Sequence, residues 1–149
     1  MKENDNIQEP REQEKSRNFL TNMEGEGVGR IISSFENPAA TMRYTQTAES
    51  IDALEGKPKE IENIIAHDVE IHDSDSGEDR RVVRIVLVSP APGSKAYAAV
   101  SDGVFNSVQM LTDSKMYGLP PFDPPIKVEL VKVKTRKGFS TSRLVPLVE

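Results

Sequence analysis

The sequence predicts a mainly β domain at residues 58–149, with strands and helix in the order β-β-β-α-β-β, behind a tail and an arm. Three observations support this prediction. From residue 60 onward, runs of β-branched or alternating apolar residues recur between turn sequences, which is typical of strands. The spacing of apolar residues becomes helical once, after residue 102. The first 17 residues, by contrast, are too polar to contribute to a core.

The N-terminal tail, residues 1–17, carries nine charged side chains and, after Met1, a single aliphatic residue, Ile7. A segment of this composition buries too little apolar surface to offset the entropy lost when its backbone is ordered. We therefore expect the tail to be disordered. The apolar content of the whole chain, 36%, is below the ~45–50% usual for globular domains, which fits a folded domain with a polar extension.

Residues 18–57 are expected to form an arm that packs on the domain or on a neighbouring subunit. Three glycines between positions 25 and 29 interrupt its apolar residues and predict a flexible connector. Residues 38–47 are predicted to be irregular or extended, and residues 48–54 to form a short helix. Pro58 then breaks the chain, so we place the domain boundary at about residue 58.

The first three strands of the domain are separated by clear turns. Residues 61–72 end in apolar/polar alternation, and residues 80–89 form the most continuous β-branched run of the chain. Residues 96–101 complete the set. Between them lie an acidic turn at residues 73–79 and a proline-containing turn at residues 90–95, and both have the composition of loops.

A helix and two further strands follow. In residues 102–116, apolar side chains at positions 104, 108 and 111 recur at helical spacing, and Asp102 is a suitable N-cap residue. Four prolines between positions 120 and 125 exclude regular structure and predict a rigid aromatic loop. Residues 126–149 then read as two strands joined by a basic turn at residues 135–138.

This order of elements is typical of the oligonucleotide/oligosaccharide-binding (OB) barrel, in which five strands close around a core and the helix lies between strands three and four. A five-stranded sheet with one helix on its face has the same order and stays an alternative. Lys127 and Glu129 have one strand parity, and Lys132 and Lys134 have the other. A β-bulge near Leu130 is therefore predicted, because it would return all four side chains to solvent and bend the strand.

Several classes of function are disfavoured by composition. The chain has no cysteine, which excludes disulfides, zinc–thiolate sites and thiol catalysis. Its two histidines lie on one strand without a nucleophile, and the acidic turn lacks the ligand spacing of a calcium loop. Neither a membrane span nor a signal peptide is recognisable. We expect a cytoplasmic protein that is not an enzyme and has no cofactor, metal site or membrane partner.

Positive charge is concentrated at the end of an acidic chain. Residues 126–149 carry six basic and two acidic side chains, a local +4 in a chain of net charge −5. Cations that follow a phosphate backbone, with aromatic rings that stack on bases, are what single-stranded nucleic acid requires. The alternatives are a solvated strand edge for the charges and core packing for the tyrosine. The predicted nucleic-acid-binding residues are Arg80, Arg84, Tyr97, Lys132, Lys134, Arg136, Lys137, Phe139 and Arg143.

One part of the chain has a family resemblance. Residues 96–108 (AYAAVSDGVFNSV), then Tyr117-Gly118, the proline-rich loop and residues 126–134 (IKVELVKVK) resemble small single-stranded DNA-binding proteins of tailed phages and related mobile elements. The resemblance covers residues 60–149. It implies a protein of the host cytoplasm that coats displaced strands during phage DNA replication or recombination, without sequence specificity.

The partners expected on this basis are single-stranded DNA, replication proteins and further copies of the chain in a homo-oligomer. The alternative function is a structural or assembly module, in which the arm at residues 18–57 docks on a neighbouring subunit.

Overall fold

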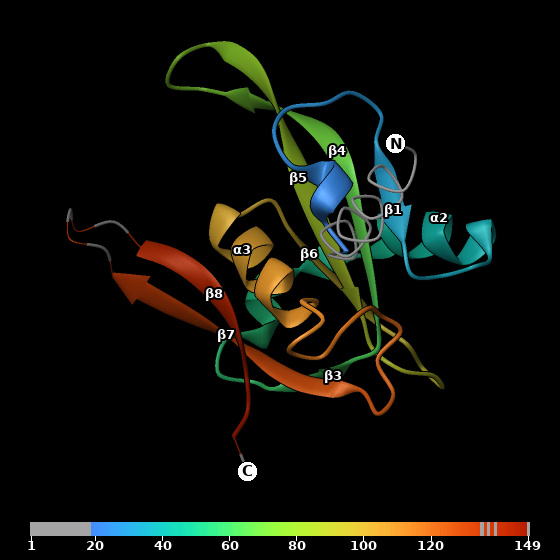
Figure 1. The fold of residues 1–149 in the computed structure, drawn as a ribbon. Coiled ribbons are helices and arrows are strands. Elements are labelled where there is room, and N and C mark those ends of the chain that lie inside the picture. The colour runs from blue at the N-terminus through green and yellow to red at the C-terminus, as the bar shows by residue number, and fades with distance from the viewer. Residues whose placement is uncertain (1–18, 135, 137, 139, 149) are drawn as a thin grey trace, which may run out of the picture.

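The computed structural model describes residues 19–134, 136, 138 and 140–148 (Figure 1). The predicted disordered tail lies outside this part of the chain. The elements are η1 Thr21–Met23, β1 Ile31–Ser33, α2 Pro38–Thr47, β2 Glu49–Ser50, η2 Ile51–Leu54, β3 Lys59–Ile61, β4 Asn63–Asp73, β5 Glu78–Val88, β6 Ala96–Ala99, α3 Asp102–Leu111, β7 Ile126–Lys134 and β8 Ser140–Pro146. The order from β4 to β8 is the predicted β-β-β-α-β-β.

The strands form two separate sheets, so the prediction of a closed barrel was wrong. One sheet has the order β1-β4-β5-β6-β2, and the other has the order β3-β7-β8. Among the described residues, one isolated bridge pairs Glu55 with Leu130 of β7. The barrel does not close because short strands occupy the edges that closure would use: β2 pairs with β6 in parallel, and β3 pairs with β7. Both come from sequence that carries no strand pattern.

The predicted bulge in β7 is also absent. The pairing with β8 runs without an extra residue from Val128 opposite Pro146 to Lys134 opposite Ser140. Leu130 is buried, but the side chains from Lys132 to Lys134 are all exposed. Beyond Leu130 the two strands project from the body, as Figure 1 shows at the left. Val131, Thr141 and Ser142 are still half-buried, whereas β7 is exposed from Lys132 onward. A ribbon of this kind has no buried parity, so it needs no bulge to expose its lysines.

The main core lies between the two sheets and α3, and it includes residues from the N-terminal segment. Leu20, Met23, Ile51 and Leu54 are buried in the same cluster as the strands. Burying one such side chain contributes about 1.5–3 kcal/mol. Residues 19–57 therefore pack on the domain, one of the two arrangements predicted for the arm; the boundary near residue 58 stays a prediction. The sheet and helix members of this core are Ile61, Ile64, Ala66, Ile85, Leu87, Tyr97, Val104, Val108, Leu111, Ile126, Val128, Leu130 and Leu144.

The opposite face of the larger sheet is covered by α2, where the sequence predicted irregular or extended chain. Asn37 caps this helix by accepting a hydrogen bond from the Ala39 amide, and Pro38 occupies its first turn. No residue of α2 is fully buried, so the sequence has no strong apolar stripe to reveal it. Tyr44 stacks on Phe35 at a centroid distance of 5.4 Å and joins the second cluster under the sheet.

The two predicted helices are both shorter than expected. The helix expected at residues 48–54 is reduced to η2, a single 3₁₀ turn capped by Ser50. The helix expected at residues 102–116 ends at Leu111, because the chain turns and the Tyr117 amide donates back to the Leu111 carbonyl over 3.1 Å. Ser101 rather than Asp102 caps its N-terminus.

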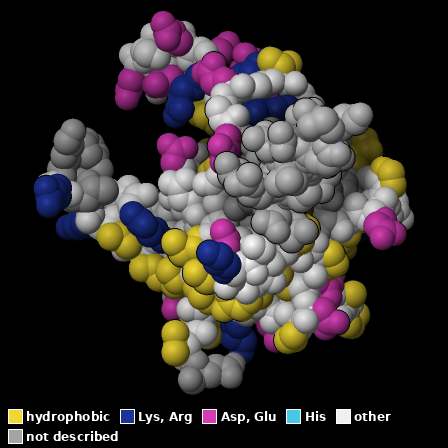
Figure 2. Space-filling view, in the orientation of Figure 1, with side chains coloured by type: hydrophobic (Ala, Val, Ile, Leu, Met, Phe, Trp, Pro, Cys, Tyr) yellow, Lys and Arg dark blue, Asp and Glu magenta, His cyan; other side chains and the backbone are white. Residues whose placement is uncertain are grey.

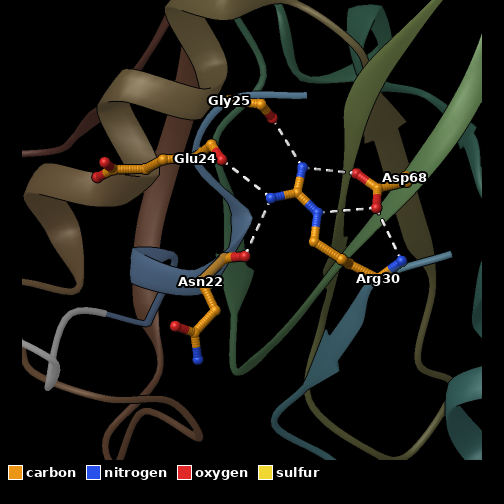
Figure 3. A network of polar contacts seen from close by, with 5 residues as sticks. All are labelled: Asn22, Glu24, Gly25, Arg30 and Asp68. Carbon is orange, nitrogen blue, oxygen red and sulfur yellow. Dashed lines mark hydrogen bonds and ion pairs between the residues drawn. The ribbon is translucent and has the colours of Figure 1, made fainter. Parts of the chain in front are cut away.

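The glycine-containing connector is tied to β4 by one arginine (Figure 3). The Arg30 guanidinium forms a fork with both carboxylate oxygens of Asp68, at 2.9 Å each. It also donates to the carbonyls of Asn22, Glu24 and Gly25 at 2.7–3.1 Å. The Asp68 side chain is only 1% exposed, and the hydrogen bonds from Arg30 lower the pKa of its carboxyl. Arg30 thus holds residues 22–30 against the sheet.

Candidate nucleic-acid interface

The β7–β8 hairpin carries the basic charge that the sequence predicted to be exposed. Lys132, Lys134, Arg136 and Arg143 are all exposed, and Figure 2 shows Lys and Arg side chains along the projecting ribbon. Side chains alternate along a strand, so Lys132 and Lys134 share one face, while Arg143, opposite Val131, lies on the other. Both faces of the ribbon therefore offer cations to a polyanion.

Among the described residues, one ion pair involves these cations. The Lys132 ammonium lies 3.7 Å from the Asp52 carboxylate, and both side chains are well exposed. Such a surface pair is worth about 0–1 kcal/mol, so a phosphate can replace it at little cost. Lys137 and Phe139, which were predicted to complete the turn, lie outside the described residues.

Arg80 lies elsewhere, on the ribbon formed by β4 and β5. It is exposed and sits opposite Ile71, close to the turn that carries the acidic residues 73, 75, 78 and 79. Figure 1 shows that this turn projects from a different part of the molecule than the β7–β8 turn. The structure therefore does not bring Arg80 together with the hairpin cations, and its acidic neighbours weaken its attraction for anions.

Arg84 is half-buried on the face of β5 that α2 covers. Its guanidinium donates to the Thr45 carbonyl at 2.8 Å and lies 3.2 Å from the His67 ring nitrogen. Burial lowers the pKa of Arg84, because the charged form is partly removed from water. The same burial, with the nearby Arg84 charge, lowers the pKa of His67. In this position Arg84 links the end of α2 to the sheet.

Tyr97 is 4% exposed and its ring belongs to the main core. Burial and the neighbouring Glu49 carboxylate raise the pKa of its hydroxyl. Most of this side chain is therefore packed in the core, which was the alternative to a binding role. Its remaining surface lines a pocket of about 370 Å³ together with Lys59, Lys95 and Lys127. Glu60 lines the same pocket, which therefore brings three lysines and one carboxylate together.

Those three lysines were not in the predicted set. They come from β3, from the turn before β6 and from the start of β7, and strand pairing brings them together: Glu60 of β3 lies opposite Lys127. No local signal in the sequence indicates this grouping, since it depends on a three-residue strand.

The described residues show no sign of other site types. No group of three or more His, Asp or Glu side chains in this part of the chain is placed to hold a metal ion. None of the helices that the structure describes is long and apolar enough to cross a membrane.

A comparison with family models gives one match. Residues 44–145 match the Phi29 model of the phage single-stranded DNA-binding proteins, from within α2 almost to the end of β8. No curated protein and no solved structure matches the chain significantly. The match covers more than half of the chain and confirms the resemblance identified from the sequence. Proteins of this family are not enzymes, as predicted. The chain therefore belongs to the family of Phi29-type phage single-stranded DNA-binding proteins.

Proposed function

We propose that this protein binds single-stranded DNA without sequence specificity and protects displaced strands during phage DNA replication or recombination. The observation that carries the proposal is the exposed, basic β7–β8 ribbon of an otherwise acidic chain. Membership of the family supports it. Cations that contact phosphates position a strand without reading its bases, which accounts for the lack of specificity.

In this proposal the backbone of the bound DNA runs along β7. Lys127 lies at one end, beside the Tyr97 pocket, and Lys134 lies at the other end, on the projecting ribbon and on the opposite face of the strand. At 3.3 Å per residue, the seven-residue interval spans about 23 Å. Lys132, Lys134 and Arg136 would neutralise phosphates along the ribbon. Tyr97 would meet a base only with the edge that its pocket leaves open.

The remaining predicted residues have different weights. Lys137 and Phe139 stay in the proposed set because they follow directly from the basic turn of the sequence. Arg80 contributes less, and Arg84 acts through the packing of α2. Replication proteins and further copies of the chain stay proposed partners in the host cytoplasm. The assembly alternative has less support, since Leu20, Met23 and Leu54 of the arm are buried in their own domain, but Val28, Ile31 and Met42 remain exposed.

A salt titration tests the proposal. Binding of a labelled dT oligonucleotide is measured by fluorescence anisotropy for the wild type and for the variant Lys132→Ala/Lys134→Ala/Arg136→Ala. Each phosphate contact to a single strand contributes about 0.7 to the slope of log Kobs against log[salt]. Loss of three contacts is therefore expected to reduce that slope by about 2.

The matched control removes three exposed cations outside the ribbon: Arg43→Ala/Lys57→Ala/Lys115→Ala. It changes the net charge equally and should leave the slope close to that of the wild type. If both variants lost the same amount of slope, the net charge of the protein alone would explain the effect. Absence of binding by the wild type at low salt would remove the proposal altogether.

A further inference from the structure

A mainly apolar pocket of about 280 Å³ lies between α3, the turn that follows it, and β8. Its walls include Met110, Met116, Tyr117 and Pro146, and Asn106 and Arg143 stand among them as polar lining residues. Figure 2 shows hydrophobic side chains gathered next to the base of the β7–β8 hairpin. The pocket is therefore adjacent to the basic ribbon, and β8 belongs to both.

Large apolar side chains are unusually exposed here. Met110 is 65% exposed, Met116 60% and Tyr117 50%, and Tyr117 is the most exposed aromatic residue that the structure describes. A cluster of this kind on a protein surface marks an interaction site more often than chance exposure does.

The tyrosine is held in place before any ligand arrives. Its backbone amide donates to the Leu111 carbonyl, and its ring meets the buried Phe122 edge-to-face, with the centroids 6.4 Å apart at 70°. Contact with Phe122 fixes the ring orientation, while half of the side chain faces solvent. A ring fixed in this way loses little conformational entropy when a flat ligand stacks on it.

The charge of the lining selects among ligands. Among the described residues that line this pocket none is acidic, and Arg143 supplies a positive charge. Four other pockets on the described surface each include an Asp or Glu side chain, in a chain with 24 of them. This pocket is therefore the one that best suits an apolar ring attached to a negatively charged backbone.

We propose that this pocket receives a nucleobase of the bound single strand. The base stacks on Tyr117 against the thioethers of Met110 and Met116, Arg143 contacts the adjoining phosphate, and the Asn106 amide faces the polar edge of the base. The inference rests on the proposed function, because the strand reaches the pocket from the β7–β8 ribbon. Stacking accepts any base, so it adds affinity without sequence specificity.

The test separates base contacts from phosphate contacts in the full-length protein. Affinities are measured for a dT oligonucleotide and for an oligomer of the same length and charge built from abasic residues. Stacking of one base raises affinity by about 5- to 150-fold, so the wild type should bind dT at least 5-fold more tightly than the abasic oligomer. Tyr117→Ala should lose most of this preference while keeping its abasic affinity and salt slope. Tyr117→Phe should keep the preference.

Two further variants guard against misfolding. Met110→Ala, at a mostly exposed position, should weaken dT binding and leave abasic binding unchanged. Met42→Ala, a 64% exposed methionine on α2, should change neither. Photocross-linking of a 5-iodouracil oligonucleotide should map to Tyr117.

Each other result has a defined meaning. An unchanged dT preference in Tyr117→Ala overturns the inference and leaves the proposed function standing. Loss of dT and abasic binding alike also overturns it, because the residue would then act through the fold. If Tyr117→Ala changes only the mass of the particle in sedimentation, the pocket binds a second copy and the inference is wrong. If the wild type binds neither oligomer, the proposed function itself fails.

Discussion

The ion pair between Arg30 and Asp68 offers a sharp test of what holds the N-terminal segment to the domain. In Arg30→Ala, the Asp68 carboxylate keeps the backbone amide of residue 30 at 2.7 Å but loses both guanidinium bonds. With the Arg30 side chain in place, the Asp68 side chain is only 1% exposed. Three loop carbonyls lose their donor in the same change.

The expected cost follows from burial. Removing one partner of a buried pair leaves an uncompensated charge and costs about 3–5 kcal/mol. For a chain of this size that corresponds to a fall of roughly 6–20 °C in the midpoint of thermal unfolding. Salt should change the loss little, because buried charges are poorly screened. Urea unfolding followed by circular dichroism measures the free energy, with the exposed Arg43→Ala as the control.

The pH dependence gives an independent check. In the wild type the pKa of Asp68 is lowered by Arg30, so the pair stabilises the fold above the unfolded-state pKa and its contribution disappears as pH falls through the folded-state pKa. Arg30→Ala removes the hydrogen bonds and the charge of the guanidinium, so the pKa of Asp68 should rise from its wild-type value. The difference between the two proteins should then be largest at neutral pH and shrink as pH falls through the folded-state pKa of the variant towards the lower one of the wild type. A loss below 1 kcal/mol at pH 7, or one that grows in acid, would refute the reasoning.

Two more predictions concern the sheets. Because burial and Arg84 lower the pKa of His67, the folded state favours its neutral ring, and stability should fall as pH drops below the ordinary value of 6.5 until the folded-state pKa is passed. His67→Asn should lose this part of the pH dependence in thermal unfolding between pH 8 and 5; an unchanged profile would contradict it. Leu130→Ala should cost about 2–5 kcal/mol in urea unfolding, whereas Val133→Ala, at a position 39% exposed, should cost less than about 0.5 kcal/mol. Equal costs would show that the ribbon does not leave the core after Leu130.

The long elements of the fold could be predicted because their burial leaves a pattern in the sequence. β4 and β5 carry β-branched residues, and α3 repeats Val104, Val108 and Leu111 at helical spacing. Where burial is slight, the pattern fails. α2 has no fully buried residue, and β2 consists of two exposed residues. The closed barrel was predicted because these polar pieces gave no sign that they occupy the sheet edges.

The prediction of a bulge in β7 failed for a related reason. The parity of Lys132 and Lys134 implies a bulge only if the strand keeps one buried face along its whole length, and the exposure beyond Leu130 shows that it does not. At the candidate site, the exposure of the hairpin cations followed from charge alone. The burial of Arg84 under α2 and the lysines around Tyr97 depend on tertiary contacts that no local sequence pattern contains.

Because the β7–β8 ribbon leaves the core, substitutions have different effects on stability at the two ends of β7. Residues up to Leu130 are constrained by packing, because a change there costs folding free energy. The β7 residues from Lys132 to Lys134 are exposed, and at exposed positions most substitutions change stability by less than about 0.5 kcal/mol. The outer half of the hairpin can therefore gain or lose charge, which changes its affinity for a polyanion, while the fold stays intact. An engineer could vary it as a cassette.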